Sequence, residues 1–198
     1  RGRGRRPRQL PPIQDHIRKG QTILVQVTKE AISTKGPRLT ADISLPGRFL
    51  VYMPYASRVG ISRKIEGRNQ RAKLRKMAQK ILPKNSGGLI VRTVGEEVTA
   101  EKLEREFKRL HERWQKIRGD ADSLSAPSPV HREATLISGV IRDLFSDKFE
   151  ALRVDSKPAY DEIVNYVKSV DPDLEDRVHL HQGETSLFDE FSVEEDIQ

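Results

Sequence analysis

The feature that most constrains the fold is a break at residues 120–129 (DADSLSAPSP), where both the composition and the sign of the charge change. Residues 1–118 contain 29 Lys and Arg and 10 Asp and Glu, a net charge of +19, whereas residues 119–198 contain 7 and 19, a net charge of −12. A run of Asp, Ser and Pro is typical of a linker. We therefore predict two units with a boundary at about residue 129, and we expect only the first to meet a polyanion such as nucleic acid. A soluble protein with charged helices is the alternative.

The overall composition limits the kind of protein further. The chain has 198 residues, of which 35% are hydrophobic and 33% charged, so a core requires well-organised apolar positions. Cysteine is absent, which excludes disulfides and thiolate metal sites and fits a reducing cytoplasm. The sequence has no apolar run of membrane-spanning length and no visible signal peptide. Because the first residue is Arg1 and not Met, we expect a piece of a longer protein.

The first unit reads as a basic arm followed by strands and helices. Residues 1–12 (RGRGRRPRQLPP) have little to bury, and we expect them to be disordered until they meet a partner. Strands are predicted at residues 22–28, 39–45, 49–53 and 89–91, with a turn at residues 33–38. A helix is predicted over residues 69–81, with one apolar face and one face bearing Arg71, Lys73, Arg75, Lys76 and Lys80.

The clearest helix follows these elements. Its apolar residues step by four and three, and Thr99 stands where it can cap the start; the stripe consists of Leu103, Phe107, Leu110, Trp114 and Ile117. One short stripe favours docking on the protein's own sheet, and pairing with another helix as a coiled coil is the alternative. Trp114 is therefore expected in the core and not as a platform for base stacking.

The second unit has the order helix, strand, helix, strand. A helical stripe runs from Leu136 to Phe145, and it is followed by a predicted strand at 150–154, a helix at 158–170 and a strand at 177–181. This order implies a parallel α/β piece. Since two strands bury little, we expect the unit to be incomplete and to lean on the first unit or to be partly unstable.

A candidate anion site follows the strand at residues 89–91. The stretch GGLIVRTVGE (residues 87–96) delivers Arg92 and Thr93 at the end of an apolar run, with the permissive Gly95 nearby. A guanidinium beside a hydroxyl suits a phosphate. Gly47, Arg48 and the segment GISRK (residues 60–64) could add backbone N–H groups and further cations around the same phosphate. A nucleoside triphosphate is not predicted, because the sequence has no GK[ST] motif.

A second basic motif, KGPR at residues 35–38, lies in the turn between two predicted strands. Lys35 in such a loop is a candidate contact with an RNA backbone, as in OB-type folds. An exposed basic turn that serves only solubility is the alternative.

Together these segments resemble the ribonuclease E/G family of bacterial and plastid endoribonucleases. The resemblance is carried by TKGPRLTADISLPGRFLVYMP, GISRKIEG, GLIVRTVG, SPVHREATLISGVIRDLFS and HLHQGETSLFDEFSVEEDI, in this order. It implies a mixed α+β and α/β fold in which residues 13–44 end an OB-type RNA-binding domain with partial β-barrel strands. Residues 45–129 would then form a small α/β 5′-sensor domain, and residues 130–198 part of an RNase H-like subdomain.

The resemblance also implies which residues contact the substrate, single-stranded RNA with a 5′-monophosphate. Arg92 and Thr93 would hold the terminal phosphate. Backbone at Gly47 and Val51 would shape the pocket, Arg63 would lie close by, and Lys35 would contact the RNA chain.

Further properties follow from the resemblance alone. Family enzymes hold Mg²⁺ with acidic residues of a later subdomain, share zinc between subunits through a cysteine pair, and act in RNA processing and decay in the cytoplasm of bacteria or in plastids. This chain carries neither ligand set, so we expect it to bind RNA without hydrolysing it. The resemblance also implies that the full-length parent is a homo-oligomer. A non-catalytic RNA-binding module that uses only the basic face is the alternative.

Two other clusters are weaker candidates. His179 and His181 alternate on one predicted strand face, but a third metal ligand at a suitable spacing is missing, which favours ordinary strand histidines. The acidic residues Asp171, Asp173, Glu175 and Asp176 superficially suggest calcium, but the position that requires glycine in an EF-hand loop is Asp176. A solvated acidic turn is the favoured interpretation.

Overall fold

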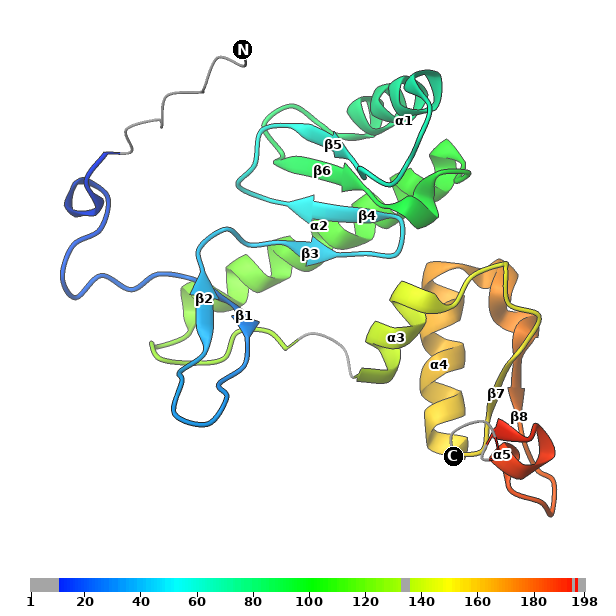
Figure 1. The fold of residues 1–198 in the computed structure, drawn as a ribbon. Coiled ribbons are helices and arrows are strands. Elements are labelled where there is room, and N and C mark those ends of the chain that lie inside the picture. The colour runs from blue at the N-terminus through cyan, green and yellow to red at the C-terminus, as the bar shows by residue number, and fades with distance from the viewer. Residues whose placement is uncertain (1–10, 133–135, 194, 196–198) are drawn as a thin grey trace, which may run out of the picture.

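The structure, a computed structural model, describes residues 11–132, 136–193 and 195 (Figure 1). Most of the predicted basic arm at residues 1–12 lies outside these residues, and a short 3-10 helix, η1 (Ile13–Asp15), follows it. The described part is a mixed α+β fold with a four-stranded sheet and two two-stranded sheets, and no sheet in it closes into a barrel. None of its helices is long and apolar enough to cross a membrane.

The first two strands form a small hairpin. Strand β1 (Gln26–Lys29) pairs antiparallel with β2 (Arg38–Thr40). The single strand predicted at residues 39–45 is wrong, because the chain bends after Thr40, whose Oγ1 accepts a hydrogen bond from the Asp42 N–H at 3.1 Å. The chain then enters a different sheet as β3 (Leu45–Pro46).

The central sheet contains β3, β4 (Leu50–Met53), β6 (Gly88–Val91) and β5 (Val59–Ile61), in that spatial order. Strands β4 and β6 were predicted, and they pair antiparallel. Strand β5 was missed because its sequence, VGI, is short and has glycine in the middle. It pairs parallel with β6, so the carboxyl ends of the two strands lie at the same edge of the sheet.

Helices α1 (Arg68–Ile81) and α2 (Ala100–Ser123) pack on this sheet (Figure 1). The predicted cap is confirmed, since Thr99 Oγ1 accepts a hydrogen bond from the Lys102 N–H at 3.3 Å. The apolar stripe docks on the protein's own sheet, and Trp114 is 4% exposed in the core. Each fully buried leucine contributes about 1.5–3 kcal/mol. Helix α2 continues to Ser123 and so takes the first part of the predicted linker.

The second unit has the predicted order and a core of its own. It contains α3 (Leu136–Leu144), β7 (Leu152–Val154), α4 (Lys157–Val170), the 3-10 helix η3 (Pro172–Arg177), β8 (Val178–Leu180) and the short α5 (Leu187–Glu190). Strands β7 and β8 pair parallel, as predicted. The buried core is small, with Ile141, Phe145, Ile163, Val167, Leu174 and Val178.

Candidate anion-binding site

The candidate site begins where the parallel strands β5 and β6 end. The Ser62 N–H donates to the Val91 carbonyl at 2.8 Å, and the Ser62 and Thr93 hydroxyls lie 3.1 Å apart. Thr93 opens a 3-10 turn, η2 (Thr93–Gly95), and is exposed. The topology therefore brings two hydroxyl groups, from segments 31 residues apart, to one point on the sheet edge.

The loop between β3 and β4 closes the site from another side. The Arg92 N–H donates to the Phe49 carbonyl at 2.8 Å, and Arg92 Nη1 donates to the Gly47 carbonyl at 2.7 Å. Gly95 lies so close to this loop that a Cβ there would be 3.0 Å from the Phe49 carbonyl oxygen. Glycine at this position thus permits the close approach of the two segments.

The structure brings together most of the residues that the sequence singled out. Arg92 bonds the Gly47 carbonyl, Thr93 bonds the Ser62 hydroxyl, and Arg63 directly follows Ser62 with an exposed side chain. Val51 lies within β4, opposite Pro46 and Ile90, one residue inside the strand. Lys35 is exposed in the turn between β1 and β2. This hairpin lies apart from β5 and β6 (Figure 1).

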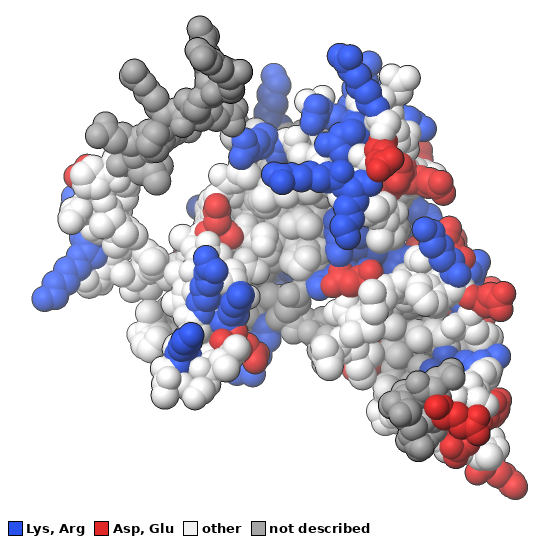
Figure 2. Space-filling model, viewed as in Figure 1, with Lys and Arg blue, Asp and Glu red and all other residues white. Residues whose placement is uncertain are grey.

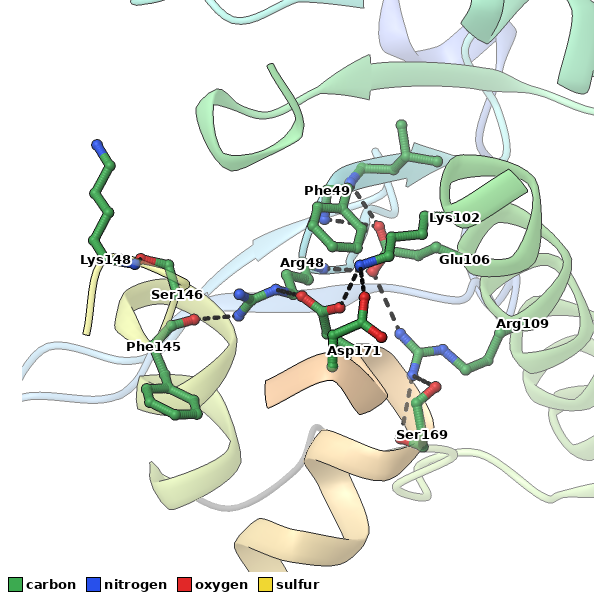
Figure 3. A network of polar contacts seen from close by, with 12 residues as sticks. Arg48, Phe49, Lys102, Glu106, Arg109, Phe145, Ser146, Lys148, Ser169 and Asp171 are labelled. Atoms are coloured by element: carbon green, nitrogen blue, oxygen red, sulfur yellow. Dashed lines mark hydrogen bonds and ion pairs between the residues drawn. The ribbon is translucent and has the colours of Figure 1, made fainter. Parts of the chain in front are cut away.

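The structure corrects one part of the expected pocket, its backbone N–H groups. The N–H groups of Arg48, Phe49 and Leu50 all donate to the Glu106 carboxylate, at 2.7, 2.7 and 2.8 Å (Figure 3). Glu106 comes from the middle of α2 and is 4% exposed. A side-chain anion of the protein therefore accepts the Arg48 N–H that we expected around a phosphate, and the Gly47 N–H donates to the Leu50 carbonyl at 2.7 Å. A Cβ at Gly47 would lie 2.7 Å from Glu106 Cδ, so a larger residue there would force this carboxylate to move.

Burial dominates the electrostatics of Glu106. Burial raises the pKa of its carboxyl above the ordinary value of 4.5, and the three backbone N–H groups and Arg109 reduce this rise without cancelling it. The sequence offered little signal for this residue, which stands between apolar positions of the α2 stripe as an acid among many.

Arg48 is also corrected, because it is not available to a ligand. It is 3% exposed, donates to the Phe145 carbonyl, and its Nε lies 3.3 Å from Asp171 Oδ2 as an ion pair without hydrogen-bond geometry (Figure 3). Both partners belong to the second unit. Arg48 therefore joins the two units, whereas Arg63 and Lys64 of the predicted segment at residues 60–64 are exposed.

The acidic turn is likewise corrected, since part of it is buried against the first unit. Asp171 is 8% exposed, and Lys102 Nζ bonds both Asp171 at 2.8 Å and Asp173 at 2.6 Å. Arg109 Nη1 adds a bond to the Ser169 carbonyl at 3.2 Å (Figure 3). These contacts show that the second unit packs against the first, as we expected.

A further cross-unit contact lies at the candidate site itself. Arg92 Nη2 is 2.6 Å from Asp143 Oδ1, which belongs to α3. The two side chains are 25% and 40% exposed, so this pair, unlike Arg48 and Asp171, is open to solvent. Nothing in the sequence pattern pointed to Asp143.

The surface of the first unit is rich in basic side chains (Figure 2). Lys and Arg gather over the first unit, whereas the far end of the second unit is acidic (Figure 2). Arg71, which was predicted on the basic face of α1, has a structural role instead. Its Nη1 donates to the Ser62 and Ile65 carbonyls at 2.6 and 2.8 Å, and so it holds the loop that carries Ser62 and Arg63.

Within the described residues, no group of three or more His, Cys, Asp or Glu side chains could hold a metal ion. His181 has an ordinary structural role, because its Nε2 lies 2.9 Å from the Thr185 carbonyl and its Nδ1 lies 3.4 Å from Glu190 Oε2. His179 lies in β8, opposite Arg153 of β7.

Fold and site together define a basic α+β unit that gathers a guanidinium and two hydroxyls at a sheet edge, with an attached α/β unit. Residues 44–198 match the sequence profile of the Ribonuclease E/G family, and the chain belongs to this family. The resemblance seen in the sequence motifs is thereby confirmed.

Individual relatives agree with this membership. The chain is 36% identical over 186 residues to Ribonuclease G of Haemophilus influenzae, covering 94% of this chain and 38% of that protein. It is 37% identical over 192 residues to a chloroplastic Ribonuclease E/G-like protein of Arabidopsis thaliana, covering 92% and 19%. It is 36% identical over 189 residues to Ribonuclease E of Haemophilus influenzae, covering 95% and 20%. The chain therefore spans well under half the length of these relatives.

Proposed function

We propose that this chain is the RNA-binding portion of a ribonuclease E/G-type endoribonuclease and that it recognises single-stranded RNA with a 5′-monophosphate for processing and decay. The observation that carries the proposal is that Arg92 and Thr93, consecutive residues after β6, are held at the sheet edge, Arg92 by the Gly47 carbonyl at 2.7 Å and Thr93 by the Ser62 hydroxyl at 3.1 Å. Membership of the family supports the same reading.

The chemistry of the site suits a terminal phosphate. Such a group has several anionic oxygens, and a guanidinium can bind two of them in parallel. The Thr93 and Ser62 hydroxyls, 3.1 Å apart, can each donate a further hydrogen bond. A 5′-triphosphate is bulkier, so a compact cluster of donors favours the smaller group.

The domain assignment is part of the proposal. The hairpin of β1 and β2 would end an OB-type domain over residues 13–44, with Lys35 in its turn as an RNA contact. The central sheet, which starts at Leu45, would be the 5′ sensor over residues 45–129, and residues 130–198 would belong to an RNase H-like subdomain. Val51 and Arg63 would complete the sensor, Val51 through backbone beside the loop and Arg63 as an exposed cation.

The catalytic apparatus is proposed to lie elsewhere in the parent protein. Hydrolysis would require Mg²⁺ held by acidic residues outside this chain, and zinc held by a cysteine pair outside it would join subunits of a homo-oligomer. The parent would act in the bacterial cytoplasm or in a plastid, and the 198-residue chain would bind RNA without cleaving it.

A titration tests the proposal. Fluorescence anisotropy with one oligonucleotide sequence, carrying either a 5′-monophosphate or a 5′-hydroxyl, is expected to give tighter binding of the monophosphate. Equal affinities with a steep salt dependence would instead favour an RNA-binding module that uses only the basic face. Counterion release reports contacts with the phosphates along the RNA backbone and does not depend on the group at the 5′ end.

A further inference from the structure

The candidate site is built from both units of the molecule. Arg92 is held at two points, by the Gly47 carbonyl at 2.7 Å from Nη1 and by Asp143 Oδ1 at 2.6 Å from Nη2. The first contact comes from the loop before β4, and the second comes from α3 of the second unit. Two contacts on different nitrogens fix both the position and the plane of the guanidinium.

Asp143 is itself held in place by a neighbour. Arg142 Nε lies 3.2 Å from Asp143 Oδ1, and Arg142 Nη2 lies 3.1 Å from Oδ2. Partial burial opposes ionisation of Asp143, but the bonds from Arg142 and Arg92 outweigh it and hold its pKa below the ordinary value of 3.8. The carboxylate is therefore charged at neutral pH and has a defined orientation.

Arg92 keeps hydrogen-bond donors for an anion while it is paired with Asp143. An arginine has five N–H donors, and the contacts to Gly47 and Asp143 use two nitrogens, Nη1 and Nη2. With 25% of the side chain exposed, Arg92 can offer further donors to a ligand while both contacts are kept.

We propose that Asp143 is the positioning residue of Arg92, so that the phosphate site of the first unit is completed by a carboxylate of the second. The inference rests on the proposed function, since the site is the same. A free arginine side chain loses much rotamer entropy when it binds a ligand. Asp143 removes that loss in advance by ordering the guanidinium before the phosphate arrives.

The test compares Asp143→Asn, Asp143→Glu and wild type in the 198-residue chain. The readout is the ratio of affinities for 5′-monophosphate and 5′-hydroxyl RNA of the same sequence. We expect Asp143→Asn to lower the ratio on the order of threefold to tenfold, and Asp143→Glu to restore part of it. Asp155→Asn makes the same charge change at an exposed position of the second unit and should leave the ratio unchanged.

Two results would overturn the proposal. Tighter binding of the monophosphate by Asp143→Asn would mean that the carboxylate competes with the ligand, and an unchanged ratio would mean that it has no part in binding. Either result requires a wild-type ratio above one.

A second readout separates this inference from the proposed function. NMR relaxation of the Arg92 side-chain Nε–H group, without RNA, should show an ordered guanidinium in wild type and a mobile one in Asp143→Asn. If the wild-type RNA ratio is one but this loss of order occurs, the proposed function fails and the positioning role stands. If Arg92 is equally ordered in both proteins, the positioning role fails whatever the RNA data show.

Discussion

Two carboxylates, those of Glu106 and Asp143, bond residues of the candidate site or of the loop beside it. They differ in exposure, in the groups that they bond and in the unit from which they come. Glu106 is 4% exposed and accepts three backbone N–H bonds, two from the loop before β4 and one from Leu50, the first residue of β4. Asp143 has a side chain that is 40% exposed and bonds the guanidinium of Arg92. The first anion belongs to the same unit as its partners, and the second comes from the neighbouring unit.

The comparison shows how burial separates structural anion binding from ligand binding. Removing a buried acceptor leaves desolvated donors without partners, which costs free energy of folding. A ligand is therefore not expected to displace Glu106 from its N–H donors. At the partly exposed edge water can replace a lost partner, and the same exposure lets a phosphate approach Arg92. The loop that contains Gly47 thus presents N–H groups to the protein interior and a carbonyl to the Arg92 guanidinium.

The strongest way to break the comparison is to remove the buried anion. Glu106→Ala leaves three backbone donors and Arg109 without their acceptor, and we expect it to lower the free energy of unfolding by about 3 kcal/mol or more. Urea unfolding followed by fluorescence of Trp114, the single tryptophan, reports on this unit. Glu104→Ala on the exposed side of α2 is the control, and a comparable loss there would contradict the assignment.

The next largest effect is expected at the ligand side. Arg92→Ala removes the charged fork, and it should weaken binding of 5′-monophosphate RNA by about 1–3 kcal/mol while leaving 5′-hydroxyl RNA unchanged. The measurement is anisotropy titration with both oligonucleotides. An equal loss of affinity for the two RNAs would mean that Arg92 contacts the RNA backbone and not its 5′ end.

A smaller effect sharpens the role of the paired hydroxyls. Thr93→Val keeps the side-chain shape but removes the hydroxyl that lies 3.1 Å from Ser62 Oγ. We expect the preference for 5′-monophosphate to fall by about 0.5–1.5 kcal/mol, the net worth of one hydrogen bond. The same titrations measure it, and Thr99→Val, which removes the cap of α2, should lower stability without changing the preference.

The smallest effect is expected in the pH dependence of the free energy of unfolding, to which Glu106 and Asp143 should contribute with opposite signs. The pKa of Glu106 is raised in the folded state, so the stability of wild type relative to Glu106→Gln should fall as pH rises above 4.5. The pKa of Asp143 is lowered, so its contribution is present above 3.8 and is lost as pH falls through the folded value. Urea unfolding of wild type, Glu106→Gln and Asp143→Asn between pH 3 and pH 7, at about half-unit steps, should therefore give opposite slopes. Slopes of one sign would contradict the contrast.

Local pattern in the sequence determined much of the fold. The stripe from Leu103 to Ile117 predicted α2 and its docking, because a period of 3.6 residues reports which face is buried. The run at residues 89–91 predicted β6, and Arg92 and Thr93 follow it at the sheet edge. The order of helices and strands after the linker predicted the parallel pair β7 and β8.

Only the tertiary structure decided which groups these elements bring together. Strand β5 has too few residues for a periodic signal, yet its parallel pairing with β6 is what sets Ser62 beside Thr93. Glu106 lies 58 residues from Arg48, and Asp143 belongs to another unit from Arg92, so neither pairing leaves a trace in local sequence. Periodicity records how each segment faces the core, whereas the partner of a charged group depends on how separate segments pack.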